Sequence, residues 1–373
     1  MSSECIQLGK KFDNSASNKF DDTAQIITIV GILTIISLLM MYSSDGLPIT
    51  IRHAIKAIFI CSICAATSFL NLRSIRKLVW PCYIAVTCML IYVAVFGHVG
   101  KGAQRWIYFA GFEFQPSEAM KLFLPMAILD IIDKRDHIFN LGTLSIVAVI
   151  SVIPIFIILK QPDLGTALLV IFIALSAVFI AGIPARWLII GTSSTILSSP
   201  LIWYKLHTYQ QKRILNLLYS DFDPQNSGYH IMQSMIAIGS GGLLGKGFMS
   251  GSQVQLKFLP EHRTDFVFAH FAEQFGFIGC IFLLILYLLL IHRLFRMSES
   301  INDFWSKATI QVIAIYIATG TVINIGMVIG LLPVVGVPLP FISYGGTNFL
   351  IFSLALTVTF ICRQHNLHTR AFK

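Results

Sequence analysis

The residue best suited to chemistry in this chain is Asp265. It lies in the stretch LPEHRTDFVF (259–268), where a long polar segment ends and a long apolar run begins, and His262 and Arg263 stand shortly before it. An ionisable group at the edge of a membrane span is costly to place there, and such groups commonly have a function. A positioned carboxylate within reach of a hydroxyl group can act as a general base.

A structural interpretation of Asp265 is also open. Thr264 or Asp265 could cap the helix that is predicted to begin at Phe266. This role is compatible with catalysis, because the helix N-terminus and Arg263 would both keep the carboxylate ionised.

Basic residues suited to binding phosphate oxygens recur in segments predicted to lie on the same membrane face as Asp265. They are Arg105, Lys160, Arg213, Lys257 and Arg263. Each one alone is at least as well explained as a solvated loop charge or a contact to anionic headgroups, but together they favour an anionic ligand. The carboxylates of Asp163 and Glu261 belong to the same segments.

Glu118 and Lys121 are three positions apart, so they share one face of a helix and can form an ion pair. Pro116 suits the first turn of that helix. Two interpretations have equal weight: a structural ion pair inside a helix bundle, and a contact with substrate. Both can hold at once, since a paired lysine can still shape a cavity.

Two other kinds of site are not supported by the sequence. The glycine-rich segment 239–247 fails the P-loop pattern, because Ser240 replaces the first required glycine and Gly247 replaces the required Ser or Thr. We expect it to form a turn packed closely against other backbone. The ten histidines are scattered without metal-ligand spacing, so no dedicated metal cage is expected.

The composition places these residues in a membrane protein. The chain of 373 residues is 55% hydrophobic and only 12% charged, whereas soluble domains carry about 25% charged residues. Apolar runs long enough to cross a bilayer predict an all-α polytopic protein with about ten membrane-spanning helices. They lie near 24–43, 54–71, 78–97, 116–132, 142–159, 164–182, 186–204, 266–291, 307–330 and 347–362.

Charge asymmetry predicts the orientation. Basic residues concentrate in the loops on the side of both termini, which is typical of the cytoplasmic face. We therefore expect a cytoplasmic N-terminal tail (1–23) without a cleaved signal peptide, a transmembrane domain (24–362), and a cytoplasmic C-terminal tail (363–373). The long loop 205–265 would lie outside the cytoplasm. Two segments, 97–116 and 331–346, are predicted to be irregular at membrane depth, where such backbone must be buried in protein or line a wet cavity.

In order along the chain, several segments resemble the SEDS family (shape, elongation, division and sporulation), and most closely its RodA branch. The matching segments are 101–106, 114–118, 161–167, 229–247, 258–268 and the signature from Asn324 through GLLP (330–333) to PLPFISYGG (338–346). The sequence departs from the family pattern in three places. His262 comes one position early, Gln274 replaces a usual glutamate, and Asn348 replaces a small residue.

The resemblance implies a peptidoglycan glycosyltransferase of the bacterial inner membrane that polymerises lipid II, a disaccharide-peptide on undecaprenyl diphosphate. It implies that Asp265 is the essential aspartate and that Glu118 and Lys121 are the family's ion pair. It also implies a class B penicillin-binding protein as partner, together with elongation proteins such as MreC and MreD. We expect Asp265 to be catalytic, and we expect a substrate site formed by Arg105, Glu118, Lys121, Lys160, Asp163, Arg213, Glu261 and Arg263.

The expected reaction is a single inverting displacement in which Asp265 accepts the hydroxyl proton of the acceptor sugar. The diphosphate leaving group needs charge stabilisation from basic residues, with or without a divalent cation. Two other functions stay open: a transporter that flips lipid II, and a non-catalytic scaffold for the penicillin-binding protein.

Overall fold

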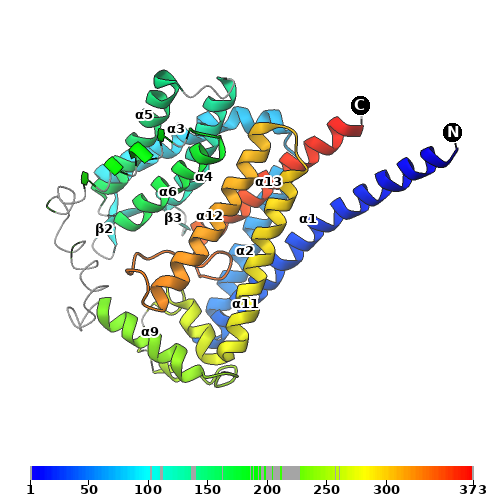
Figure 1. Ribbon diagram of the computed structural model, residues 1–373. Helices are drawn as coiled ribbons and strands as arrows, with labels where there is room; N and C mark the ends of the chain where they lie inside the picture. The colour runs from blue at the N-terminus through cyan, green and yellow to red at the C-terminus, as the bar shows by residue number, and fades with distance from the viewer. Residues whose placement is uncertain are drawn as a thin grey trace.

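A computed structural model describes residues 2–100, 103–109, 112–135, 140–161, 163–184 and 227–371 except 257 and 260, together with a few isolated residues between 186 and 211. The chain forms a bundle of long helices (Figure 1). Both termini lie at one end of the bundle, and the strands and α9 lie towards the other. Two termini at the same end agree with the even number of spans that the sequence predicts.

Among the described residues before the long loop, the bundle has six helices and a small sheet. The helices are α1 (Ser2–Asp45), α2 (Leu47–Ser68), α3 (Leu72–Phe96), α4 (Pro116–Lys134), α5 (Leu141–Lys160) and α6 (Leu164–Ile180). The sheet contains β1 (His98–Gly100), β2 (Ala103–Phe109) and β3 (Phe112–Phe114). Helix α1 starts well before the predicted span, and its N-terminal part projects away from the bundle (Figure 1).

The second half begins beyond the long loop. It contains α9 (Ser227–Gly241), the short α10 (Ser252–Gln255), α11 (Val267–Glu299), α12 (Phe304–Val328) and α13 (Gly346–Ala371). Helix α11 packs against α1, α9 and α12, and α12 also packs against α4, α6 and α13. The two halves of the chain therefore share one apolar core.

Nine of the ten predicted spans coincide with helices, while the span predicted at 186–204 falls largely outside the described residues. Within the described part of the chain, seven helices are long and apolar enough to cross a membrane, and α6 is a shorter apolar helix. Helix α4 carries more charged residues than the candidate spans, but nearly all of its residues are buried. Its charged side chains have partners within the protein. Asp130, for example, accepts hydrogen bonds from Arg76 Nε at 2.7 Å and from Trp80 Nε1 at 2.8 Å. Burial with partners is what allows a charged helix at membrane depth.

The prediction of irregular backbone at 97–116 is wrong. The segment folds into an antiparallel meander in the order β1-β2-β3, with Ile107 opposite Phe114 and Tyr108 opposite Glu113. The run Trp106 to Phe109 is rich in aromatic and β-branched residues, which favour strands.

The prediction for 331–346 is confirmed. This segment, here called the Pro-rich loop, has no helix or strand from Leu331 to Gly345. Its later residues are buried, with Leu339 and Ile342 fully enclosed and Phe341 1% exposed. Helix α13 begins directly after it, at Gly346.

Candidate functional site

Asp265 lies just before α11, on a turn that faces the Pro-rich loop. One carboxylate oxygen, Oδ2, lies 3.4 Å from the point where a Cβ atom on Gly336 would sit. Gly336 has a φ of 72°, which L side chains rarely adopt. The backbone of the Pro-rich loop at Gly336 therefore lies directly beside the carboxylate.

The structure places the N-cap of α11 at Phe266, directly after Thr264 and Asp265, and the side chain of Phe266 itself makes no capping hydrogen bond. Thr264 donates through Oγ1 to Glu261 Oε2 at 2.9 Å. Thr264 thus ties Glu261 to the turn that carries Asp265.

Arg263 is paired with a residue that the sequence did not single out. Its guanidinium donates to Asp45 Oδ1 at the end of α1, and His262 Nε2 lies 3.5 Å from Asp45 Oδ2. The sequence predicted that Arg263 would bind phosphate and help to keep Asp265 ionised, and the structure shows that it also forms an ion pair with Asp45. In the sequence, Asp45 is recognisable as a carboxylate at the end of the first apolar run. The sequence alone does not show that it contacts Arg263.

A second group of predicted residues meets at the start of α6. Asp163 is its N-cap and accepts from Thr166 N at 3.2 Å. Asp163 Oδ2 also accepts from Gln115 Nε2 at 3.2 Å and lies 3.6 Å from Arg105 Nε. The sheet is what places Arg105, on β2, beside this helix terminus. Gln115 was not among the predicted site residues.

The Pro-rich loop joins the two groups. A Cβ atom on Gly165 would lie 2.6 Å from the carbonyl oxygen of Val335, so α6 and this loop touch backbone to backbone. The next residue, Gly336, faces Asp265. The start of α6, with Asp163 and Arg105, and the turn bearing Asp265 therefore flank adjacent residues of one loop.

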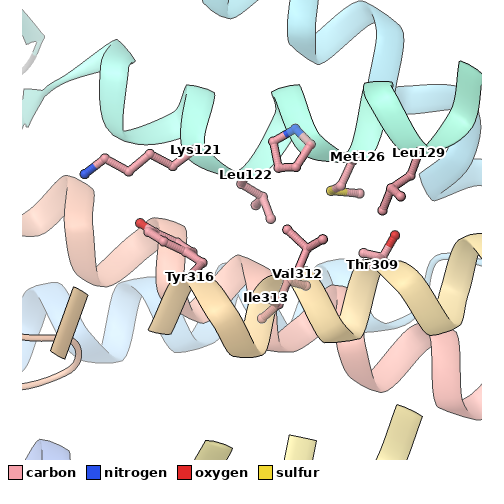
Figure 2. A pocket seen from close by; sticks show the side chains of 9 residues that line it. Lys121, Leu122, Met126, Leu129, Thr309, Val312, Ile313 and Tyr316 are labelled. Carbon is pink, nitrogen blue, oxygen red and sulfur yellow. The ribbon is translucent and has the colours of Figure 1, made fainter. Parts of the chain in front are cut away.

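Glu118 and Lys121 form the predicted ion pair, with Lys121 Nζ 2.6 Å from Glu118 Oε1. Both residues are buried, at 5% and 3% exposure. Lys121 lines a small pocket between α4 and α12, where its ammonium group and the Tyr316 hydroxyl lie at the same end (Figure 2). The buried pair favours the interpretation of a structural ion pair inside the bundle. Lys121 also lines the wall of the pocket.

The other predicted residues are spread more widely. The ammonium group of Lys160 lies over the Phe156 ring, 4.9 Å from its centroid, on an exposed part of α5. Arg213 and Lys257 lie outside the described residues. Arg105 and Asp163 are thus close together, Arg263 and Glu261 belong to the turn of Asp265, and Lys160 stands apart from both sets.

The glycine-rich segment packs as predicted. A Cβ atom on Gly245 would lie 2.1 Å from the Gln274 carbonyl oxygen, and Gly276 kinks α11 at φ 64° to receive the turn. Lys246 N donates to Glu273 O at 3.0 Å, and Lys246 Nζ reaches Glu273 Oε1 at 2.7 Å. These contacts fix α9 and the following turn against α11, close to the segment that carries Asp265.

One histidine near the site has a perturbed pKa. His230 lies on α9, outside the candidate membrane spans, with its ring 6.1 Å from that of Phe266. Burial lowers the pKa of His230, and the Glu261 carboxylate opposes that shift. Within the described ranges, no group of three or more His, Cys, Asp or Glu side chains could hold a metal ion.

Comparison with known proteins gives consistent matches over most of the chain. The model of the family FTSW_RODA_SPOVE, described as "Cell cycle protein", matches residues 20–367. A curated relative, peptidoglycan glycosyltransferase MrdB of Escherichia coli (strain K12), is 39% identical over 291 residues, covering 77% of this chain and 78% of the relative.

Solved structures are similar over nearly the whole chain. The crystal structure of Thermus thermophilus rod shape determining protein RodA superposes with a TM-score of 0.70 at 25% identity, covering 91% of this chain and 96% of that one. A chain from the structure named "Structural coordination of polymerization and crosslinking by a peptidoglycan synthase complex" gives a TM-score of 0.81 at 28% identity, covering 91% and 97%.

Proposed function

This chain belongs to the FtsW/RodA/SpoVE family, and from that membership we propose that it is a peptidoglycan glycosyltransferase that polymerises lipid II during cell elongation. The observation that carries the proposal is the position of Asp265. Its carboxylate lies at the start of a membrane helix and against Gly336 of the Pro-rich loop, with Arg105 and Asp163 across that loop.

In the proposed reaction, the 4-hydroxyl oxygen of the acceptor sugar forms a bond to the anomeric carbon of the donor. The bond between that carbon and the diphosphate oxygen breaks, and the hydroxyl proton moves to Asp265. One carboxylate suffices, because an α-linked donor giving a β-linked product needs a single inverting displacement. A positioned general base of this kind contributes roughly 10²- to 10⁴-fold to the rate.

The departing diphosphate takes up negative charge, which fixed cations stabilise. Arg105 is the described cation best placed for this role, because Asp163 and the sheet hold it near the start of α6. Lys160 and Arg213 stay proposed phosphate contacts from the sequence alone, since Lys160 stands apart from Arg105 and Arg213 lies outside the described residues. Arg263 contributes with a charge that it shares with Asp45.

We propose that any divalent cation required enters with the diphosphate. The described residues offer single carboxylates near the site, with no cluster of three or more ligands. Such a cation would neutralise the phosphate oxygens of the leaving group.

In the proposed orientation, the site faces the periplasm and both termini lie in the cytoplasm of a bacterium, with the chain in the inner membrane. Basic loops on the side of the termini support it, as does the placement of the Pro-rich loop away from the termini (Figure 1). The proposed partner is a class B penicillin-binding protein, which would cross-link the strands. It is supported by the solved relative that couples polymerization to crosslinking. MreC and MreD are proposed from the RodA-like sequence alone.

The test uses the full chain, purified and reconstituted in liposomes with labelled lipid II, with and without a class B penicillin-binding protein. The expected result is glycan polymer, with the labelled headgroups consumed. Movement of lipid II across the bilayer without polymer would contradict the proposal and favour a transporter. Cell-wall synthesis that survives Asp265→Ala would favour a scaffold.

A further inference from the structure

Three consecutive carbonyl groups of the turn that carries Asp265 each accept a hydrogen bond. Tyr344 N donates to Arg263 O at 2.8 Å, Ser343 Oγ donates to Thr264 O at 2.6 Å, and Asn324 Nδ2 donates to Asp265 O at 2.9 Å. The donors come from the end of the Pro-rich loop and from α12. Hydrogen bonds thus hold the backbone carbonyl groups of residues 263, 264 and 265.

Asn324 links two segments through a single amide group. Besides Asp265 O, its Nδ2 donates to Val337 O at 2.7 Å. Both acceptors are carbonyl oxygens, so only the NH₂ side of the amide can face them. The side chain is fully buried, and its Oδ1 atom has no hydrogen-bond partner among the described residues. Asn324 therefore acts in this fold as a donor.

Ser343 repeats this arrangement on the neighbouring carbonyl group. Its Oγ donates to Thr264 O and accepts from Leu339 N at 2.7 Å. The residue is 3% exposed. Like Asn324, it joins the turn before α11 to the Pro-rich loop by one buried polar side chain.

These bonds govern where the Asp265 carboxylate lies relative to the loop. Val337 follows Gly336, and a Cβ atom on Gly336 would lie 3.4 Å from Asp265 Oδ2. Asn324 thus fixes the backbone of the base and the loop backbone beside its carboxylate relative to each other. A misplacement of about 1 Å in a catalytic group can reduce the rate about 10²-fold.

We propose that Asn324 and Ser343 are positioning residues that hold Asp265 at the distance and angle required for proton transfer. The inference rests on the proposed function, in which Asp265 is the general base. Neither side chain needs to touch substrate. Their effect passes through the backbone of residues 264 and 265.

The test measures lipid II polymerisation by the full chain carrying Asn324→Ala or Ser343→Ala. We expect kcat to fall about 10- to 100-fold in each variant while KM for lipid II stays within about twofold, because a displaced base impairs the chemical step and not substrate binding. Folding is checked by the midpoint of thermal unfolding in detergent.

Two matched controls remove the same kinds of bond elsewhere. Asn366 Nδ2 donates to Ser300 O at 2.8 Å, and Ser234 Oγ donates to Val328 O at 2.7 Å, both from buried side chains. Asn366→Ala and Ser234→Ala should lower the unfolding midpoint by amounts similar to those of the test variants and leave kcat near wild type. Wild-type kcat in folded Asn324→Ala and Ser343→Ala would overturn the inference.

A second readout separates positioning from general weakening of the fold. Residues that act as one unit lose activity non-additively, so adding Asn324→Ala to Asp265→Asn should leave the residual rate unchanged. If Asn324→Ala lowered the polymerisation rate by the same factor with and without Asp265→Asn, Asn324 would act independently of the base. Near wild-type polymerisation by Asp265→Asn alone would instead refute the proposed function, and the two failures are therefore distinguishable.

Discussion

Gly165→Ala should impair catalysis although Gly165 lies on α6, away from Asp265 in the sequence. The added Cβ atom would sit 2.6 Å from Val335 O and 2.7 Å from Val335 Cβ. The first distance is about 0.8 Å inside the 3.4 Å at which ordinary contact begins. Backbone cannot rotate out of the way as a side chain can, so α6 and the Pro-rich loop must separate by a comparable amount.

That separation moves Gly336, which is the next residue and borders the Asp265 carboxylate. Overpacking of a closed contact costs roughly 1–3 kcal/mol of stability, and a displacement approaching 1 Å at a catalytic group costs up to about 10²-fold in rate. We therefore expect a folded protein with a lower unfolding midpoint and a kcat reduced about 10- to 100-fold.

The assay is lipid II polymerisation at several substrate concentrations, with unfolding followed in parallel. Gly31→Ala on α1 is the control, because a Cβ atom there meets no atom within 4 Å. It should keep wild-type kcat and gain up to about 1 kcal/mol in stability, since alanine is favoured over glycine inside helices. A folded Gly165→Ala protein with wild-type kcat would refute the coupling of α6 to the base through the loop.

Three further predictions concern charged and titrating groups. Lys121→Met leaves the buried Glu118 carboxylate unpaired and should lower the free energy of unfolding by about 3–5 kcal/mol. Adding Glu118→Gln should restore much of this stability. Equal unfolding midpoints for the single and double variants would contradict the prediction. Asp163→Ala removes the N-cap of α6, at about 1 kcal/mol, and the ion pair with Arg105, so the unfolding midpoint should fall slightly while KM for lipid II rises. The pKa of His230 is lowered in the folded protein, so near the ordinary histidine pKa of about 6.5 the unfolded chain binds more protons than the folded one. The free energy of unfolding therefore falls as the pH drops through that range. His230→Gln should flatten that decrease, as measured by unfolding midpoints at neutral and mildly acidic pH, and an unchanged slope would contradict the assignment.

Most of the fold could be predicted from the sequence because membrane spans depend on length and apolarity alone. Helix α4 was predictable despite its charges, since Glu118 and Lys121 are spaced to pair with each other. The sheet was missed because β1 and β3 are only three residues long, too short for alternation to be visible.

The candidate site was predictable only in part. Asp265, Glu118, Lys121, Arg105 and Asp163 were predicted from residue type and local spacing, and the structure pairs Glu118 with Lys121 and brings Arg105 beside Asp163. The partner of Arg263 could not be found in this way, because Asp45 lies more than two hundred residues earlier and its proximity depends on how α1 packs against α11. The same reason hides the bonds from Asn324 and Ser343 to the turn, which run between side chains and backbone carbonyl groups.

The most direct test of the account is the polymerisation rate of purified Asp265→Asn measured together with its affinity for lipid II. This substitution keeps the size of the side chain and removes its ability to accept a proton. We predict a folded protein that binds lipid II with near wild-type affinity and polymerises it roughly 10²- to 10⁴-fold more slowly. Polymerisation at close to the wild-type rate would contradict the claim that Asp265 is the general base.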